Sequence, residues 1–258
     1  MSKTEGATLT YSGVALPVKL GAPTLIEFLL EVQFEPSVVS AGDVLPGLLF
    51  NRYRDTHGGI LRAPSSAILK QAREQDPRLK YLATSRLVGP SGHVLLGDRV
   101  FGVSAVGRYP GWSEFRKEAV RVIDAMKDTQ TVKHVERASI KAVNVIPIPE
   151  GHQLGALACS IQMYGKEIGD FGLVLRSEHH TKNHVAIVEL ATNTAIQVNN
   201  GVPVSGLMIS VDILPRVPPP IELSEIALLL DPAHEELKRR FFGLLTPETI
   251  ASLKPEYK

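Results

Sequence analysis

The sequence predicts an α+β protein in which an antiparallel-dominated sheet forms two similar or fused lobes, with helices packed on one face. Apolar residues alternate with polar ones in both halves of the chain, as in half-buried strands. Each half ends in a helical pattern, so that runs of strands precede helices and do not alternate with them. We therefore expect an N-terminal arm (1–21), a first lobe (22–130) and a second lobe (131–258), or one continuous domain, and no dinucleotide-binding fold.

The strands and helices of the first lobe follow from local periodicity. Alternation over residues 24–35 places Ile26, Phe28, Leu30 and Val32 on one side and Glu27 and Glu31 on the other. Residues 112–127 carry apolar side chains at helical spacing and form the strongest helix pattern in the chain. The remaining elements expected here are a helix at 43–54, strands at 81–88 and 93–106, and a turn at 89–92.

The second lobe is richer in strands. Turns containing Gly, Asn or Pro separate its runs, which is typical of an antiparallel meander. The expected strands are 135–146, 155–164, 171–176, 184–191 and 204–214. Pro218–Pro220 then form an extended connector, and helices finish the chain, with start signals at Asp231-Pro232 and Thr246-Pro247.

Composition limits the functional classes. The 258 residues are 44% hydrophobic and 21% charged, which suits a globular protein with a sizeable core. The net charge of +1 gives no overall attraction to nucleic acid or to an anionic membrane. Cys159 is the single cysteine and lies in an apolar run, so we expect a buried, inert thiol in a reducing compartment. Residues 1–20 lack the features of a signal peptide, and we expect a cytoplasmic protein with no membrane association.

The N-terminal arm carries alternating apolar residues on both sides of Ser12-Gly13, from Leu9 to Val18. It can form β-structure but is too short to have a core of its own. Such an arm pairs either with an edge of its own sheet or with another chain. We therefore expect a homo-oligomer or a complex with a protein partner.

Several segments together resemble a sporadically distributed family of uncharacterised bacterial proteins. They are the opening strand 22–34, Asp98-Arg99-Val100-Phe101 leading to Tyr109-Pro110-Gly111-Trp112, the strand 143–149, and Ala233-His234-Glu235 with Phe241-Phe242. In the family an Arg-Tyr pair is usual where Lys141 and Ala142 stand in this chain. The resemblance implies the fold and a patchy distribution, as for an accessory component of a mobile or defence-type bacterial locus, and it implies no reaction.

The segment from Glu178 to His184 has more potential metal-binding or catalytic side chains than any other short stretch of the sequence. It holds three imidazoles, His179, His180 and His184, and imidazole is a ligand for zinc, copper and iron. The segment lacks the helical spacing of known histidine metal motifs and lies between two expected strands. We interpret it as a polar hairpin turn and expect no metal.

Asn144 shares its parity with the apolar residues of its strand, which predicts a buried amide. A buried amide either holds neighbouring backbone in place or faces a ligand. Tyr109 and Trp112 are the other candidate ligand-binding residues, although both also suit packing at a helix start. Glu27, Glu31 and Glu35 share a strand face, but residues four apart on a strand are about 13 Å apart, too far for a carboxylate pair.

No motif for nucleophilic catalysis or phosphate binding occurs, so we predict no catalytic residues and no cofactor. The leading hypothesis is a non-catalytic binding or adaptor protein that acts with a partner. One alternative is a small-ligand sensor with its pocket between sheet and helix near Asn144. Another is a metal-dependent hydrolase that uses His179, His180 and His184.

Overall fold

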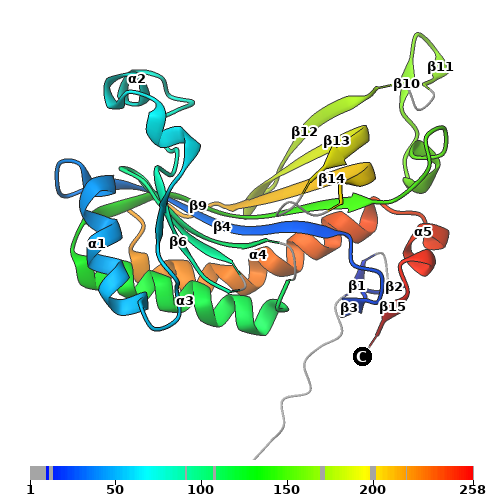
Figure 1. The fold of residues 1–258 in the computed structure, drawn as a ribbon. Helices are drawn as coiled ribbons and strands as arrows, with labels where there is room; N and C mark the ends of the chain where they lie inside the picture. Colours follow the sequence, from blue (N-terminus) through cyan, green and yellow to red (C-terminus); the bar gives the residue numbers. More distant parts are fainter. Residues whose placement is uncertain are drawn as a thin grey trace, which may run out of the picture.

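The computed structural model describes residues 10–11, 14–90, 92–106, 109–168, 172–197, 202–218 and 220–257. Its main element is a nine-stranded antiparallel sheet with the long helices on one side, which confirms the predicted fold class (Figure 1). We call the side that carries these helices the covered face and the other side the open face. Both predicted lobes contribute strands to this one sheet.

The strands follow one another across the sheet in the order β12 (Val174–His180), β13 (His184–Ile196), β14 (Val204–Pro215), β9 (Val132–Ile146), β4 (Leu25–Pro36), β8 (Val100–Val106), β7 (His93–Leu96), β6 (Ser85–Val88) and β5 (Ile60–Arg62). The halves of the chain meet at the centre, where β4 pairs with β9 over almost its whole length. This long pairing joins the strands of the two predicted lobes into a single sheet.

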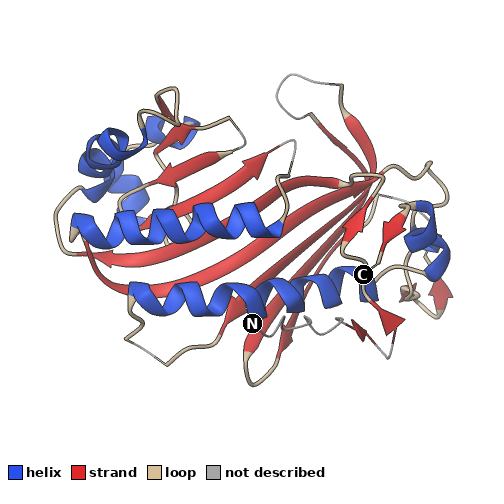
Figure 2. Cartoon of the chain, turned by 90° about the horizontal axis from the view of Figure 1, so that it is seen from below, coloured by secondary structure: helices blue, strands red, loops and turns tan. Residues whose placement is uncertain are grey.

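Two long helices cross the covered face, α3 (Trp112–Thr129) and α4 (Leu223–Gly243), as Figure 2 shows. Helix α1 (Ala41–Tyr53) packs beside α3 and against β6 and β7. The shorter elements are α2 (Lys70–Gln75), α5 (Pro247–Ser252) and 3₁₀ turns at Pro64–Ala67 and Leu154–Ala156. In the described ranges, no helix has the length and apolar character needed to cross a membrane.

Strand β4 shows why the sheet has two different faces. Phe28, Leu30 and Val32 are at most 3% exposed and lie under the helices, as their spacing predicts. Ile26 is only half-buried, because a bulge between Leu25 and Glu27 interrupts the register with β9 there. Glu27 lies on the open face with Glu31, and both carboxylates are half-buried, not fully exposed.

The predicted strand 93–106 is wrong in one respect, because it is two strands, β7 and β8, joined by a tight turn. A side chain at Gly97 would place its Cβ 2.5 Å from the carbonyl oxygen of Leu82 and 2.9 Å from Val100 Cγ1. Only glycine fits so close to another backbone segment. The glycine therefore lets the chain reverse where hydropathy alone suggests one long strand.

The predicted strand 155–164 and the buried state of Cys159 are also wrong. The amide of Ala158 donates to the carbonyl of Leu244 at 2.8 Å, and Thr246 donates to Ala156 at 3.0 Å, so this backbone is bonded to the end of α4 and not to the sheet. Leu157 is buried in that contact, whereas Cys159 is exposed. A hairpin of β10 (Gln162–Met163) and β11 (Lys166–Glu167) follows.

Helix α4 begins at Leu223, soon after the proline connector, and continues through Asp231-Pro232, so the helix start predicted there is wrong. A capping box starts it, in which the amide of Glu222 donates to Glu225 Oε2 at 2.8 Å. Pro232 lies inside the helix and leaves the carbonyl of Leu228 without its helical donor. Leu228 is 75% exposed, so water can satisfy that carbonyl. The start at Thr246 is confirmed, since its Oγ1 accepts from the amide of Thr249.

The N-terminal arm pairs with itself and with the other end of the chain. Strand β1 (Thr10–Tyr11) pairs with β2 (Val14–Ala15), and β3 (Lys19–Leu20) pairs with β15 (Pro255–Glu256). We call the β3–β15 pair the terminal clip. Residues 1–9 and 12–13 lie outside the described residues, and association through the arm stays a prediction.

Candidate functional site

Asn144 is buried, as predicted, at 5% exposure. Its Oδ1 accepts a hydrogen bond from Thr24 Oγ1 at 3.0 Å, and the next amide, that of Val145, donates to the carbonyl of Thr24 at 2.8 Å. The two bonds tie β9 to the residue that precedes β4. The amide therefore holds backbone in place, which is one of the two roles that its parity predicts.

Tyr109 and Trp112 lie together in an aromatic cluster between α3, α4 and β4. The Trp112 ring stacks on His234 with centroids 3.9 Å apart and planes 1° apart, and its Nε1 donates to Asp231 Oδ1 at 2.8 Å. Tyr109 packs on Phe28 at 5.1 Å, and burial raises the pKa of its hydroxyl. Trp112 thus connects the start of α3 to α4, and Tyr109 packs the residues just before α3 against β4.

Burial within this cluster lowers the pKa of His234 to about 4. Lys238 adds to the shift, whereas Asp231 opposes it. The imidazole is therefore neutral at neutral pH.

The three histidines of the 178–184 segment have separate partners. His184 Nε2 lies 3.1 Å from Glu236 Oε1 of α4, on the covered face. His180 Nδ1 accepts from Arg216 at 2.7 Å, and His179 Nε2 lies 3.3 Å from Ser177 Oγ. The segment is a hairpin between β12 and β13, as predicted. Within the described ranges, no three His, Cys, Asp or Glu side chains are grouped to hold a metal ion.

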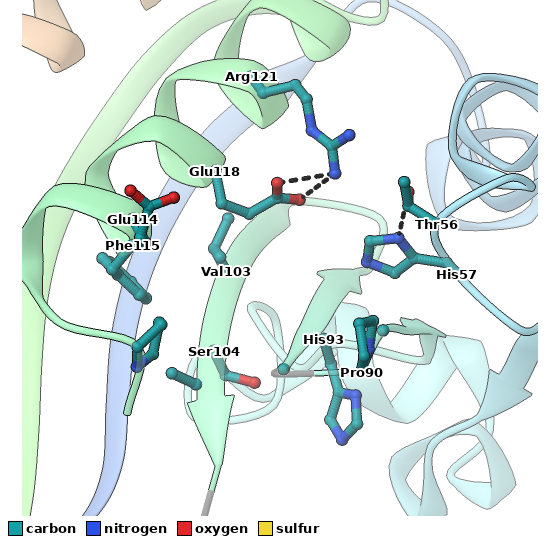
Figure 3. A pocket seen from close by; sticks show the side chains of 14 residues that line it. Thr56, His57, Pro90, His93, Val103, Ser104, Glu114, Phe115, Glu118 and Arg121 are labelled. Atoms are coloured by element: carbon teal, nitrogen blue, oxygen red, sulfur yellow. Dashed lines mark hydrogen bonds and ion pairs between the residues drawn. The ribbon is translucent and has the colours of Figure 1, made fainter. Parts of the chain in front are cut away.

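A pocket of ≈ 200 Å³ lies beside the N-terminal half of α3, between this helix, β7, β8 and the loop that follows α1 (Figure 3). No residue of the predicted sites lines it. The lining residues are Thr56, His57, Gly89, Pro90, Gly92, His93, Val103, Ser104, Ala105, Pro110, Glu114, Phe115, Glu118 and Arg121.

The protonation of His57 follows from its neighbours. Thr56 Oγ1 lies 3.1 Å from the carbonyl oxygen of Tyr53, which also accepts from the backbone amides of Thr56 and His57. The same Oγ1 lies 3.0 Å from His57 Nδ1, and which of these two atoms donates depends on the tautomer of the ring. Burial lowers the pKa of His57, which favours the neutral ring. A neutral ring has one unprotonated nitrogen, which can accept a hydrogen bond.

Close packing holds the His57 ring in this orientation. The ring contacts Tyr53 edge to face, with centroids 5.0 Å apart. On its other side, a Cβ added to Gly89 would lie 2.7 Å from His57 Nε2 and 3.0 Å from the carbonyl oxygen of Gly92. The glycine lets the 89–92 loop pass beside the imidazole, and Figure 3 shows the ring directed into the pocket from the α1 side.

Glu118 and Arg121 enter the pocket from α3. The Nη2 atom of Arg121 lies 2.9 Å from Glu118 Oε1 and 2.7 Å from Oε2, and its guanidinium lies over the Tyr53 ring at 4.4 Å. These contacts fix the Glu118 carboxylate opposite His57 (Figure 3). With Glu114 at the side, the charged lining residues sum to one net negative charge, and Glu114 also pairs with Lys117, outside the lining, at 2.7 Å.

His93 lies at the base of the pocket, across β7 and β8 from Ser104. Burial is the main cause that lowers its pKa, and the charge of Arg86 adds to the shift. Its Nδ1 is enclosed and has no hydrogen-bond partner among the described atoms. The walls of the pocket are largely apolar and come from Phe115, Val103, Ala105, Pro90 and Pro110. The pocket therefore combines an apolar lining with a few convergent polar groups.

Sequence reasoning missed this site because its residues come from four separate stretches of the chain. His57, Gly89, Ser104 and Glu118 share no motif and no common periodicity. The only local signal is an isolated histidine before Gly58-Gly59, which is also typical of an ordinary turn.

A second perturbed group, Asp212, lies on the open face. Burial raises the pKa of its carboxyl to about 6, against opposing effects of Ser139, Lys141 and Arg137. Its Oδ1 is enclosed without a hydrogen-bond partner in the described part of the chain. Lys141 faces Asp212 directly across the β9–β14 pair. Asp212 has a shifted pKa but is not among the residues that line the His57 pocket.

The sequence matches no model of a protein family and no curated protein. Membership of the bacterial family that the sequence resembles stays a prediction.

Proposed function

We propose that this protein binds a small amine in the pocket between α3 and the loop after α1. The observation that carries the proposal is the position of the His57 imidazole, which lies in the pocket opposite the Glu118 carboxylate and can accept a hydrogen bond in its neutral form. Glu118 supplies a second acceptor on the opposite wall. A ligand that donates hydrogen bonds to both groups fits this arrangement.

Charge and size specify the ligand further. The pocket carries one net negative charge, which favours an ammonium group over a carboxylate. Its walls at Phe115, Val103 and Pro90 suit an apolar body beside that group. The ≈ 200 Å³ volume lies below the ~300–1,000 Å³ of sites for drug-sized molecules. A small amine with a short apolar portion meets all three conditions.

The proposal develops the ligand-sensor hypothesis drawn from the sequence and moves its pocket from Asn144 to His57. Both places lie between the sheet and a helix, but the amide of Asn144 is already bonded to Thr24. The adaptor role, a protein partner and the metal-dependent hydrolase stay predictions.

Benzylamine is a suitable probe, with benzyl alcohol and benzoate as matched compounds of similar shape. We expect benzylamine to raise the melting temperature above neutral pH, because a ligand of the native state stabilises it by about 1.4 kcal/mol at ten times its Kd. Benzoate should give no shift. Because a protonated His57 cannot accept a hydrogen bond, the affinity should fall on acidification through its lowered pKa. Equal shifts from the amine and from benzoate would contradict the proposal.

Variants locate the binding. His57→Phe retains the ring that packs on Tyr53 but removes Nε2, and Glu118→Gln removes the carboxylate charge. Each should weaken benzylamine binding about tenfold or more in calorimetry, as loss of a hydrogen bond to a charged group predicts. Asp124→Asn, at an exposed position of the same helix, is the control and should leave affinity unchanged. Wild-type affinity in His57→Phe would place the ligand elsewhere.

A further inference from the structure

Strand β12 is the outer strand at one end of the main sheet (Figure 1). Within the described ranges, β13 is its only strand neighbour. Val174 is 80% exposed, and the side chains of Arg176, Glu178 and His180 are also exposed. A seven-residue edge of this kind presents unpaired backbone groups to any strand that can align with it.

The bonds at the two ends of the β12–β13 pair show which backbone groups are free. Thr192 donates to the carbonyl of Leu173 at 3.0 Å, and Thr181 donates to the carbonyl of His184 at 2.9 Å. Both bonds fit the register of the β12–β13 pair, and both involve an odd-numbered residue on the β12 side. Because every second residue of an antiparallel strand is bonded to the same neighbour, the odd-numbered residues of β12 are those bonded to β13. The amides and carbonyls of the even-numbered residues therefore point outward, at Val174, Arg176, Glu178 and His180.

A second copy of the same strand complements these groups. If two β12 strands run antiparallel about a twofold axis at Ser177, Arg176 faces the partner's Glu178, and Val174 faces the partner's His180. All four outward residues then pair with outward residues. Each such pair carries two backbone hydrogen bonds, and opposite charges face each other twice.

Neighbouring registers are less favourable. An axis at Arg176 places this residue opposite its own copy, and an axis at Glu178 does the same for the carboxylate. Like charges directly opposite each other on paired strands are destabilising. An axis at Leu175 or His179 leaves some of the outward residues beyond the overlap. The order of charges along β12 therefore selects Ser177 as the centre.

We propose that the chain forms a homodimer through antiparallel pairing of β12 with β12 of a second copy, centred on Ser177. The twofold axis is perpendicular to the sheet, so the two sheets join into one and their open faces lie on the same side. Contacts within the chain already hold the charged side chains at this edge, since Arg176 Nη1 lies 2.6 Å from Glu178 Oε1 and its Nε 3.4 Å from Glu189. The dimer does not depend on the amine-binding proposal.

Charge exchange tests the register. Light scattering across a concentration series should give twice the 28.1 kDa mass of the chain for the wild type. Arg176→Glu and Glu178→Arg should each give monomer, because each places like charges opposite each other, and the double variant should restore the dimer. Arg62→Glu, on edge strand β5 at the opposite end of the sheet, is the control and should remain dimeric. A monomeric wild type, or a double variant that stays monomeric, would overturn the proposal.

A cross-link tests the same geometry independently of charge. At the axis the two Ser177 residues form a non-hydrogen-bonded pair with Cα atoms about 4.5 Å apart, within the range of a disulfide. Ser177→Cys in a Cys159→Ser background should form a dimer that survives denaturation without reductant. Leu61→Cys on β5 in the same background should not. A failure of Ser177→Cys to cross-link under mild oxidation would contradict this register.

Discussion

The two faces of β4 are held by different kinds of interaction. On the covered face Phe28 touches Tyr109, Trp112, Phe115 and His234, and dispersion and burial hold the helices in place. On the open face Glu31 accepts from Gln33 and lies 3.4 Å from Arg137. Burial also favours the neutral form of ionisable groups on both faces, among them His234 on the covered face and Asp212 on the open face. Burial thus affects the electrostatics of both faces, and not only of the apolar one.

Substitution of adjacent residues on β4 should separate the two faces most strongly. Phe28→Ala removes a side chain that is 3% exposed from the centre of the aromatic cluster and should cost about 3–5 kcal/mol of unfolding free energy. Leu29→Ala, half-buried on the open face, should cost about 1 kcal/mol. Urea denaturation of both variants measures the difference. Similar costs would mean that the open face carries as much packing as the covered one.

The stacked imidazole should make the covered face sensitive to acid. His234 has a pKa of about 4 in the folded chain and near 6.5 when unfolded, so the unfolded chain binds its proton first as pH falls. Stability is therefore lost between about pH 6.5 and 4, by about 3 kcal/mol. His234→Phe keeps a ring against Trp112 and should remove this part of the loss. Denaturation midpoints compared at pH 7 and 4.5 test it, and an unchanged slope in the variant would contradict the assignment.

The open face should show the opposite sign with a smaller effect. Asp212 has a pKa of about 6 when folded and near 3.8 when unfolded, so its stabilising contribution is complete below about pH 3.8 and is lost as pH rises to 6. Asp212→Asn removes the buried charge and should therefore stabilise the protein at pH 8. The expected gain is about 2 kcal/mol, less than the pKa difference alone gives, because the buried amide has a desolvation cost of its own. No gain is expected near pH 3.8. Thermal melts at both pH values distinguish this outcome from a gain independent of pH.

Elements set by local periodicity were predictable from the sequence. The alternation of β4 and the helical spacing of α3 each produce one buried face, which the burial of Phe28 and Phe115 confirms. The sequence also indicated the polar hairpin at 178–184 and the buried state of Asn144. In each of these cases the pattern that predicts the structure lies within a few neighbouring residues of the sequence.

Other features depend on contacts between distant residues. The turn at Gly97 exists because the backbone of Leu82 passes beside it, and residues 156–158 bond to the end of α4 and not to a strand. The His57 site needs Thr56, the 89–92 loop and α3 to converge, which no local pattern records. Pro232 was misread as a helix start because the capping box at Glu222 and the exposure of Leu228 outweigh its local signal.

The terminal clip has a consequence for the order of folding. It pairs Leu20 with Pro255, and the entropy of closing so long a loop is large compared with what two short strands gain on pairing. The clip can therefore close only after β4, β9 and the helices have brought the two ends together. We expect the clip to open in the native state before the central sheet does, so its amides should exchange with solvent before those of the central strands.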